Sequence, residues 1–176
     1  MGKKLEVTGK YDATAEVYDR RYAQIQRRKY EVVESFLPGR CGAVLDLGCG
    51  SGLFLESLAR RSAVLVGIDI SGRMLEKAGR RGKAMMVRGD AENLPFADGC
   101  FDVVVSVTVL QNLPDPGRAV REVARVLKRG GLAILTSLKK KHGPDDLEEM
   151  VRSAGLNVVR SGEIPDSEDS FCVAQR

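Results

Sequence analysis

The chain has 176 residues, a formal net charge of +4, four cysteines and a single histidine, His142. Its length suits one domain, residues 1–176, and no apolar run approaches the roughly 20 residues of a membrane span. The cysteines show neither metal-ligand spacing nor the density of a disulfide scaffold, and the N-terminus lacks the apolar core of a secretory signal. We therefore expect a cytoplasmic protein with reduced thiols and no metal site.

An amphipathic helix is predicted over residues 10–36, where Tyr11, Tyr18 and Tyr22 recur at steps that place them on one helical face. This helix should end before Pro38, which cannot continue it. The chain is thus expected to consist of an N-terminal helical cover, residues 1–40, and a core, residues 41–176.

Strands and helices alternate along the core. Apolar strands are predicted at 43–47, 63–69, 84–88, 101–107 and 132–138, with two final strands at 156–164 and 170–175. Helices are predicted at 51–60, 71–79, 116–128 and 144–154. Asp115 is the expected N-cap of the third of these helices, and Gly130 and Gly131 are its expected end. This alternation predicts an α/β domain with a mostly parallel sheet.

The most informative stretch is VLDLGCGSGLF, Val44 to Phe54. An apolar strand ends here in a turn with a glycine at every second position, Gly48, Gly50 and Gly52. Glycines let the backbone approach a ligand closely and leave amide groups available at the start of a helix. In a doubly wound sheet, this turn is where nucleotide-like ligands bind.

Three aspartates, Asp46, Asp69 and Asp90, close successive strands with gaps of 23 and 21 residues. In a parallel sheet they should lie along one edge, with Asp69 placed to accept from ribose hydroxyls and Asp90 from an adenine amino group. Residues 94–96 are expected to form an apolar wall for the base. One such acid alone is more often a helix cap or a solvated turn residue. Three in register beside a glycine turn favour a nucleoside site.

The glycine spacing narrows the kind of nucleoside. Leu53 stands where the third glycine of the dinucleotide fingerprint would fall, and no lysine–serine or lysine–threonine pair of a phosphate-binding loop follows. Asp46, two residues before the first glycine, would repel a pyrophosphate but suits an ammonium group. The pattern therefore disfavours a nicotinamide-dependent dehydrogenase.

The segments VLDLGCGSG, VGIDIS, GDAENLPF, FDVVVSVTVLQNLPDP and REVARVLKRGGLAIL resemble the successive motifs of class I S-adenosylmethionine-dependent methyltransferases. They are most similar to the subgroup that contains the ubiquinone/menaquinone-biosynthesis methyltransferases. The resemblance implies a Rossmann-like seven-stranded sheet of order 3-2-1-4-5-7-6 with the last strand antiparallel. It also implies helices on both faces and an N-terminal helix over the cofactor.

The resemblance further implies which residues bind S-adenosylmethionine. The expected contacts are to the methionine moiety (Gly48, Gly50, Ser51, Gly52 and the backbone of Val107), its amino group (Asp46), the ribose (Asp69) and the adenine (Asp90 and Ala91). Tyr11 and Tyr18 are candidates for contacting the methionine carboxylate, with packing of their helix on the sheet as the alternative. Met74 is expected beside the adenosine, with a plain core methionine as the alternative.

Methyl transfer from a sulfonium is an in-line displacement whose main need is the alignment of nucleophile, methyl group and sulfur. A general base is therefore optional, and the candidates are Gln111, Asn112 and His142. For His142 the alternative is a solvated loop position. Asn112 begins the sequence N-L-P-D, which lacks the adjacent prolines and the aromatic residue of the N-P-P-Y motif, so methylation of an exocyclic base amine is disfavoured.

Only the residues KKKHG separate the fifth strand from the next helix, so no substrate cap is predicted and the pocket should be open. Basic residues near this edge, among them Arg27, Arg28, Lys29 and residues 139–141, could meet phosphates, with a solvated basic face as the alternative. We therefore expect a macromolecular acceptor, tRNA or protein, and a small activator subunit at a sheet edge is a candidate partner. The alternatives are a small-molecule acceptor, such as a quinone precursor, and a cofactor-binding subunit without transfer activity.

Overall fold

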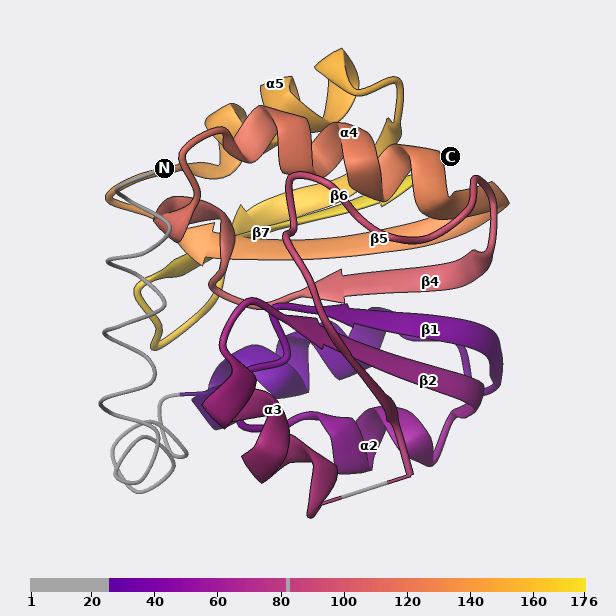
Figure 1. Cartoon of the computed structure of the whole chain (residues 1–176). Helices are drawn as coiled ribbons and strands as arrows, with labels where there is room; N and C mark the ends of the chain where they lie inside the picture. Colours follow the sequence, from indigo (N-terminus) through magenta and orange to yellow (C-terminus); the bar gives the residue numbers. More distant parts are fainter. Residues whose placement is uncertain (1–25, 82) are drawn as a thin grey trace.

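The computed structural model describes residues 26–81 and 83–176 of the chain (Figure 1). Its strands form a seven-stranded sheet in the order β3-β2-β1-β4-β5-β7-β6, which confirms the predicted topology. Neighbouring strands are parallel except at β7, which runs antiparallel to both β5 and β6. The strands are β1 Cys41–Leu47, β2 Ser62–Asp69, β3 Met85–Arg88, β4 Phe101–Ser106, β5 Leu127–Leu138, β6 Asn157–Glu163 and β7 Asp169–Gln175.

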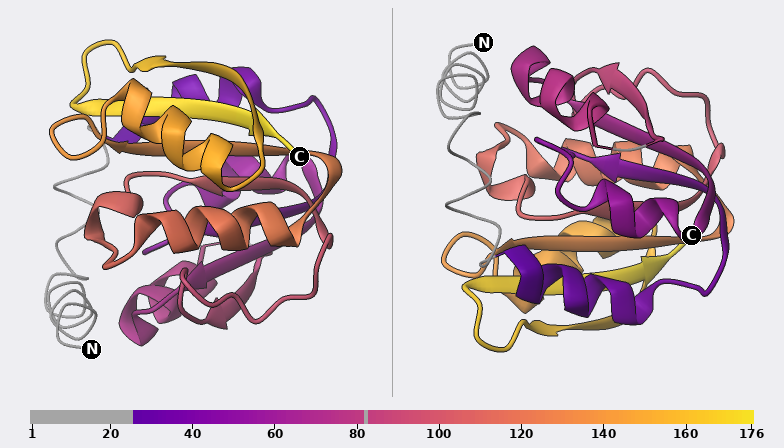
Figure 2. Two further views of the ribbon diagram at one scale, coloured as in Figure 1. Left: turned by 90° about the horizontal axis from the view of Figure 1, so that it is seen from above. Right: turned by 90° about the horizontal axis from the view of Figure 1, so that it is seen from below.

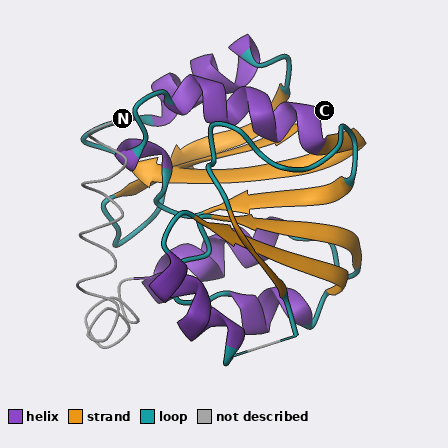
Figure 3. Ribbon diagram, in the orientation of Figure 1, coloured by secondary structure: helices purple, strands orange, loops and turns teal. Residues whose placement is uncertain are grey.

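Helices cover both faces of the sheet (Figure 3). The described helices are residues 26–36, α2 Leu55–Ala59, α3 Gly72–Gly79, the short 3-10 helix η1 Leu110–Asn112, α4 Pro116–Val126 and α5 Pro144–Ser153. α4 and α5 lie on one face, and helix 26–36, α2 and α3 lie on the other, as the two opposite views of Figure 2 show. Because side chains alternate along a strand, Leu45 and Leu47 pack toward α4, whereas Val44 packs toward α2.

The start of β5 differs from the sequence prediction. β5 begins at Leu127, five residues earlier than expected, so Gly130 and Gly131 lie within the strand instead of ending α4. Leu127 is fully buried and pairs with Phe101, after which the register of the β4–β5 ladder shifts. Gly130 has a φ of +76° in this irregular stretch. The glycine pair therefore permits a bulge in a strand, which the sequence pattern did not distinguish from a helix stop.

The start of α2 also differs, whereas the start of α4 agrees with the prediction. α2 begins at Leu55 and not at Ser51, because residues 51–54 form turns around Gly52, whose φ is +81°. Asp115 is the N-cap of α4, as predicted, and its side chain accepts a hydrogen bond of 2.8 Å from the backbone N–H of Arg118.

The helix over residues 26–36 confirms the described part of the predicted N-terminal helix. The ring of Tyr30 stacks on Phe54 at 4.3 Å between centroids, and Val33 is fully buried against the sheet. Tyr11 and Tyr18 lie outside the described residues. Among residues 26–81 and 83–176, no helix is long and apolar enough to cross a membrane.

Candidate cofactor site

A cleft lies at the carboxyl ends of β1, β2, β3 and β4, the edge where the sequence places the glycine turn and the three aspartates. The residues lining it are Leu47, Gly48, Gly50, Ile68, Asp69, Ile70, Met74, Gly89, Asp90, Ala91, Val107, Thr108, Val109, Asn112, Leu113 and Pro114. A smaller hollow adjoins it and is lined by Gln26, Tyr30, Asp46, Gly48, Cys49, Gly50, Ser51, Leu53, Phe54 and Val107. The two share residues of the glycine turn, so they meet there.

Most of the predicted cofactor residues line these two hollows. They are Asp46, Gly48, Gly50, Ser51, Asp69, Met74, Asp90, Ala91 and Val107. Gly52 lines neither hollow. A Cβ added there would lie 3.0 Å from Ala78 of α3, so Gly52 allows the turn to pack closely against that helix. Tyr11 and Tyr18 lie outside the described part of the chain.

The glycine turn is held directly against the end of β2. The backbone N–H groups of Gly48 and Cys49 donate to the carbonyl of Ile68 at 2.8 and 3.0 Å, and the N–H of Gly50 donates to Asp69 Oδ2 at 2.9 Å. Gly48 and Gly50 both have positive φ values, +75° and +53°, which favour glycine. The turn is thereby fixed in a shape that presents its backbone to the cleft.

Asp69 is oriented by backbone groups on both sides. Its Oδ2 accepts from Gly50, and its Oδ1 accepts from the N–H of Ser71 at 2.9 Å. The hydroxyl of Ser71 in turn caps α3 by accepting from the N–H of Met74 at 3.1 Å. The Asp69 carboxylate is therefore preorganised at the cleft wall, where it can accept hydrogen bonds from ligand hydroxyls.

The apolar wall beside Asp90 is not the one predicted from residues 94–96. Leu94 is 5% exposed and belongs to the core under α4, and the ring of Phe96 packs edge-on against Phe101 at 5.1 Å. Apolar side chains from other elements face the cleft instead, among them Met74 and Leu113. Met74 is expected at this site, whereas Leu113 comes from a separate segment that no local pattern pairs with Asp90.

Asp46 is almost completely buried, with 4% of its surface exposed, at the wall of the smaller hollow. Burial raises the pKa of this carboxyl group to about 7, and the nearby Asp69 carboxylate adds to the rise. A buried acid of this kind is stabilised in its charged form by a cation. The carboxylate of Asp46, a hydrogen-bond acceptor, therefore fits the ammonium group of S-adenosylmethionine.

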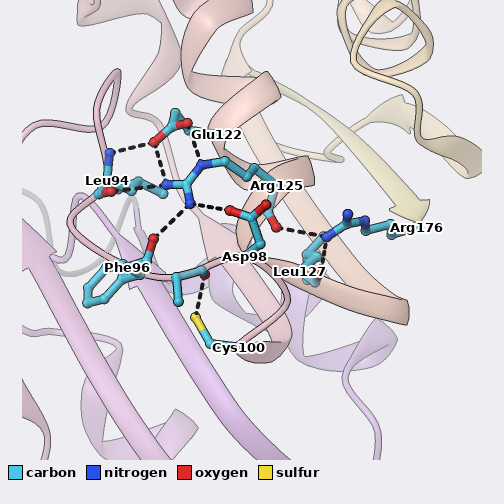
Figure 4. Close-up of polar contacts among 9 residues, drawn as sticks. Leu94, Phe96, Asp98, Cys100, Glu122, Arg125, Leu127 and Arg176 are labelled. Atoms are coloured by element: carbon cyan, nitrogen blue, oxygen red, sulfur yellow. Dashed lines mark hydrogen bonds and ion pairs between the residues drawn. The ribbon is translucent and has the colours of Figure 1, made fainter.

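The loop that carries Asp90 is clamped from behind by Arg125 of α4 (Figure 4). The guanidinium donates to the carbonyls of Leu94 and Phe96 at 3.0 and 2.8 Å, and it pairs with Asp98 and Glu122 at 2.8 Å each. Glu122 also accepts from the N–H of Leu94 at 2.7 Å. Hydrogen bonds from Arg125 hold the pKa of Glu122 below its usual range. This clamp fixes the path of the chain between β3 and β4.

Of the three catalytic candidates, only Asn112 lines the cleft. Gln111 and His142 line neither of the two hollows, and they are joined through Ser137. The Gln111 amide donates to the carbonyl of Thr108, the Ser137 hydroxyl donates to Gln111 Oε1 at 3.1 Å, and His142 Nδ1 lies 2.8 Å from Ser137 Oγ.

Lys29 and Thr108 have roles that the sequence does not predict. Lys29 is expected among the basic residues near this edge, but its side chain is 4% exposed and its Nζ lies 2.9 Å from Asp169 Oδ1. Arg27 and Arg28, its neighbours, are exposed as expected. Thr108 lines the cleft with a φ of +59°. No sequence signal identifies either residue, because both roles depend on an aspartate 61 or more positions away.

The sheet has this strand order, a glycine turn after β1, and acids at the ends of β1 and β2 and just after β3. These features together define the class I S-adenosylmethionine-dependent methyltransferases. The sequence profile of the methyltransferase domain family matches residues 45–135, about half of the chain. The chain therefore belongs to this family, whose cofactor is S-adenosylmethionine.

Individual proteins show the same relationship. The chain is 44% identical over 88 residues to a demethylmenaquinone methyltransferase of Corynebacterium kroppenstedtii, covering 50% of this chain and 38% of that protein. This match confirms the predicted subgroup resemblance. The chain is 34% identical over 155 residues to a malonyl-[acyl-carrier protein] O-methyltransferase of Legionella pneumophila, covering 82% and 52% of the two chains. It thus spans about a third to a half of the length of the curated relatives it matches.

A solved structure shares the fold at low sequence identity. It is a complex between the Haloferax volcanii Trm112 methyltransferase activator and a methyltransferase, and it matches with a TM-score of 0.80 at 23% identity, covering 94% of this chain and 96% of that chain. At this identity, the likeness concerns the fold.

The raised pKa of Asp46 predicts a distinct pH dependence of stability. Because the folded chain holds a proton on Asp46 up to about pH 7, which the unfolded chain releases near pH 4, the stability should fall as the pH rises through that window. Asp46→Asn should remove this loss and be more stable than the parent chain at pH 8, on the order of 2–4 kcal/mol. Urea denaturation at several pH values measures the free energy of unfolding of both chains.

Asp102→Asn is the contrasting variant. A hydrogen bond from Lys128 lowers the pKa of Asp102, so this variant should lose stability above about pH 4. An Asp46→Asn curve parallel to that of the parent chain would contradict the assignment.

The Arg125 clamp predicts a loss of both stability and cofactor affinity. Arg125→Met keeps the apolar stem but removes the donor to the carbonyls of Leu94 and Phe96 and leaves Glu122 with only the N–H of Leu94, at a cost of about 1–3 kcal/mol. Urea denaturation gives the stability, and calorimetry with S-adenosylmethionine gives the affinity. Arg152→Met is a matched control, since the Arg152 side chain pairs with Glu148 on the surface of α5, away from the loop of Asp90. Equal effects of the two variants would show that the clamp does not support the cleft.

Proposed function

We propose that this chain transfers a methyl group from S-adenosylmethionine to a nucleophile on an acceptor by in-line displacement. The observation that carries the proposal is that Asp69 and Asp90 line the cleft and Asp46 lines the hollow that adjoins it at the glycine turn. Asp69 would hold the ribose hydroxyls, Asp90 with Ala91 the adenine, and Asp46 the ammonium group. A proton on Asp46 would have to leave when the ammonium binds.

The chemistry asks the protein mainly for alignment. S-adenosylmethionine, when bound, supplies an electrophilic methyl group on a positively charged sulfur. The backbone of Gly48, Gly50 and Val107 would fix the methionine end, so that an acceptor entering past Asn112 could meet the methyl group in line with the sulfur. Orientation of this kind contributes on the order of 7–11 kcal/mol to such reactions, and no general base is required.

We propose a macromolecular acceptor, RNA or protein, as the leading candidate. The loop between β5 and α5, residues 139–143, is short, and no inserted element covers the cleft from this side among the described residues. Lys140 and Lys141 are exposed in this loop, and Arg27 and Arg28, which both pair with Glu31, are exposed on helix 26–36. Together these cations offer a positive charge that suits a phosphate backbone or an acidic protein surface.

A small-molecule acceptor is the second candidate. It is favoured by the similarity to a demethylmenaquinone methyltransferase, whose name states a quinone acceptor. A cofactor-binding subunit without transfer activity is the third candidate. The presence of all three aspartates in the two hollows argues against this last alternative, since a degenerate copy without transfer activity would be free to lose them.

We also propose a small activator subunit that pairs with the open edge of β3. This edge strand has four residues, and among the described residues it leaves the first half of β2 unpaired on the side away from β1. Met85 and Val64, exposed by 57% and 43%, present apolar side chains there. An open edge with apolar side chains favours pairing with another chain. The structural neighbour that was solved with the Trm112 activator adds support for a partner of this kind.

Calorimetry tests the cofactor assignment. The chain should bind S-adenosylmethionine and show no binding of NAD. Asp69→Ala should weaken the binding of S-adenosylmethionine by about 1–3 kcal/mol, because the hydrogen bonds to the ribose are lost. Glu56→Ala, which removes an exposed acid of α2, is the control and should bind like the parent chain. Binding of NAD alone would refute the assignment, and an unchanged affinity of Asp69→Ala would refute the position of the ribose.

Transfer of a radiolabelled methyl group into fractionated extract tests the acceptor. Extract from a strain without this protein supplies unmethylated acceptors and any partner chain. We expect the label in the RNA or protein fraction when chain and labelled S-adenosylmethionine are added. Label in the small-molecule fraction would favour the second candidate, and cofactor binding without label in any fraction would favour the third. Asp69→Ala serves as the inactive control.

A further inference from the structure

Lys29 and Asp169 form a buried ion pair behind the cleft. Lys29 Nζ lies 2.9 Å from Asp169 Oδ1, and the two side chains are 4% and 0% exposed. Lys29 comes from helix 26–36, whereas Asp169 is the first residue of β7, so the pair joins the N-terminal helix to the far end of the described chain. Burying two charges costs much of the energy that their attraction returns. A pair of this kind calls for an explanation beyond stability.

Both charged side chains form a hydrogen bond with the hydroxyl of Thr108. Lys29 Nζ donates to Thr108 Oγ1 at 2.8 Å, and this hydroxyl donates to Asp169 Oδ2 at 2.6 Å. Thr136 completes the network, because its hydroxyl accepts from the N–H of Thr108 at 2.9 Å and donates to Asp169 Oδ2 at 3.2 Å. The Thr108 carbonyl accepts from the amide of Gln111. All polar groups of Thr108 are therefore engaged.

This network holds Thr108 in a conformation that it would not adopt alone. Its φ of +59° lies in the left-handed region, where a β-branched residue is an outlier. Such conformations persist only when the surrounding structure enforces them, and they concentrate at functional sites. The conformation sets the direction of the chain on either side, and both Val107 and Val109 line the cleft.

Val109, the residue after Thr108, contacts the glycine turn itself. A Cβ added to Gly48 would lie 2.4 Å from Val109 Cγ2, so the valine side chain packs directly on the backbone of the turn. The contacts thus run from Lys29 and Asp169 to Thr108, and from the loop of Thr108 to Gly48. Neither charged side chain lines the cleft or the adjoining hollow.

We propose that Lys29 and Asp169 are positioning residues for cofactor binding: they enforce the backbone of Thr108, which places Val107 and Val109 against the glycine turn. The inference rests on the proposed function, because its readout is the affinity for S-adenosylmethionine. The competing explanation is that the ion pair only fastens helix 26–36 to the sheet. In that case, a variant that regains the stability of the parent chain would also regain its affinity for S-adenosylmethionine.

Removing both charges separates the two explanations. Lys29→Met alone leaves a buried carboxylate without its partner and should destabilise the chain, whereas Lys29→Met/Asp169→Leu removes both charges and should recover most of the stability. If the pair positions Thr108, the double variant should still bind S-adenosylmethionine at least about tenfold more weakly than the parent chain, as expected for the loss of hydrogen bonds to charged groups. Urea denaturation and calorimetry give the two quantities. A double variant that recovers both stability and affinity would overturn the proposal.

A second pair of variants acts on Thr108 without removing a charge. Thr108→Val keeps the shape of the side chain but loses the hydroxyl, and Thr108→Ser keeps the hydroxyl. We expect Thr108→Val to bind S-adenosylmethionine more weakly than Thr108→Ser, and equal affinities would overturn the proposal. Ser57→Ala is the matched control for the packing of helix 26–36. Ser57 lies on α2, and its Oγ donates to Glu34 of helix 26–36 without touching Thr108. It should lose stability and keep its affinity.

The parent chain distinguishes this inference from the proposed function. A parent chain that does not bind S-adenosylmethionine would refute the proposed function itself. A parent chain that binds, together with a stable double variant that binds equally well, would refute only the positioning role of Lys29 and Asp169.

Discussion

The junction between the glycine turn and the end of β2 is the contact on which the site depends. Backbone N–H groups of the turn donate to the carbonyl of Ile68 and to the carboxylate of Asp69, so the turn after β1 and the end of β2 form one unit. Only a backbone with positive φ values at Gly48 and Gly50 can make this closure. Once it is made, Asp46 and Asp69 must lie near one another, and the electrostatics of the cleft follow.

Those electrostatics explain why the site suits a cationic nucleoside. Asp46 is buried beside another carboxylate, and its pKa is raised to about 7 by burial and by that neighbour. A phosphate would increase the repulsion, whereas an ammonium group would relieve it. Exposed basic side chains lie elsewhere, on helix 26–36 (Arg27 and Arg28) and on the loop after β5 (Lys140 and Lys141). The carboxylates of the site are thus kept apart from these surface cations.

Two polar clamps outside the cleft support its loops. Arg125 holds the loop after β3 through the carbonyls of Leu94 and Phe96. The Lys29–Asp169 pair holds the loop after β4 through the hydroxyl of Thr108. The first clamp lies under α4 and the second under the N-terminal helix, so each face of the sheet supports one side of the site. Loops that must bind a ligand without collapsing need such support, since their own backbone groups are only partly paired.

The sequence by itself determined the sheet order, through its resemblance to a known family, and most of the predicted residues that line the two hollows. The reason is that these features are local: an apolar strand, a glycine turn and an acid at a strand end are each encoded within a few residues. The misplaced start of β5 and the wall assigned to residues 94–96 show where local signals fail, because a glycine pair serves a bulge as well as a helix end, and burial of Leu94 depends on α4. Only the tertiary structure decided that Lys29 is buried against Asp169 and that Thr108 is strained between them. These contacts join residues on separate elements, and no pattern within one segment can encode which distant charge will meet another.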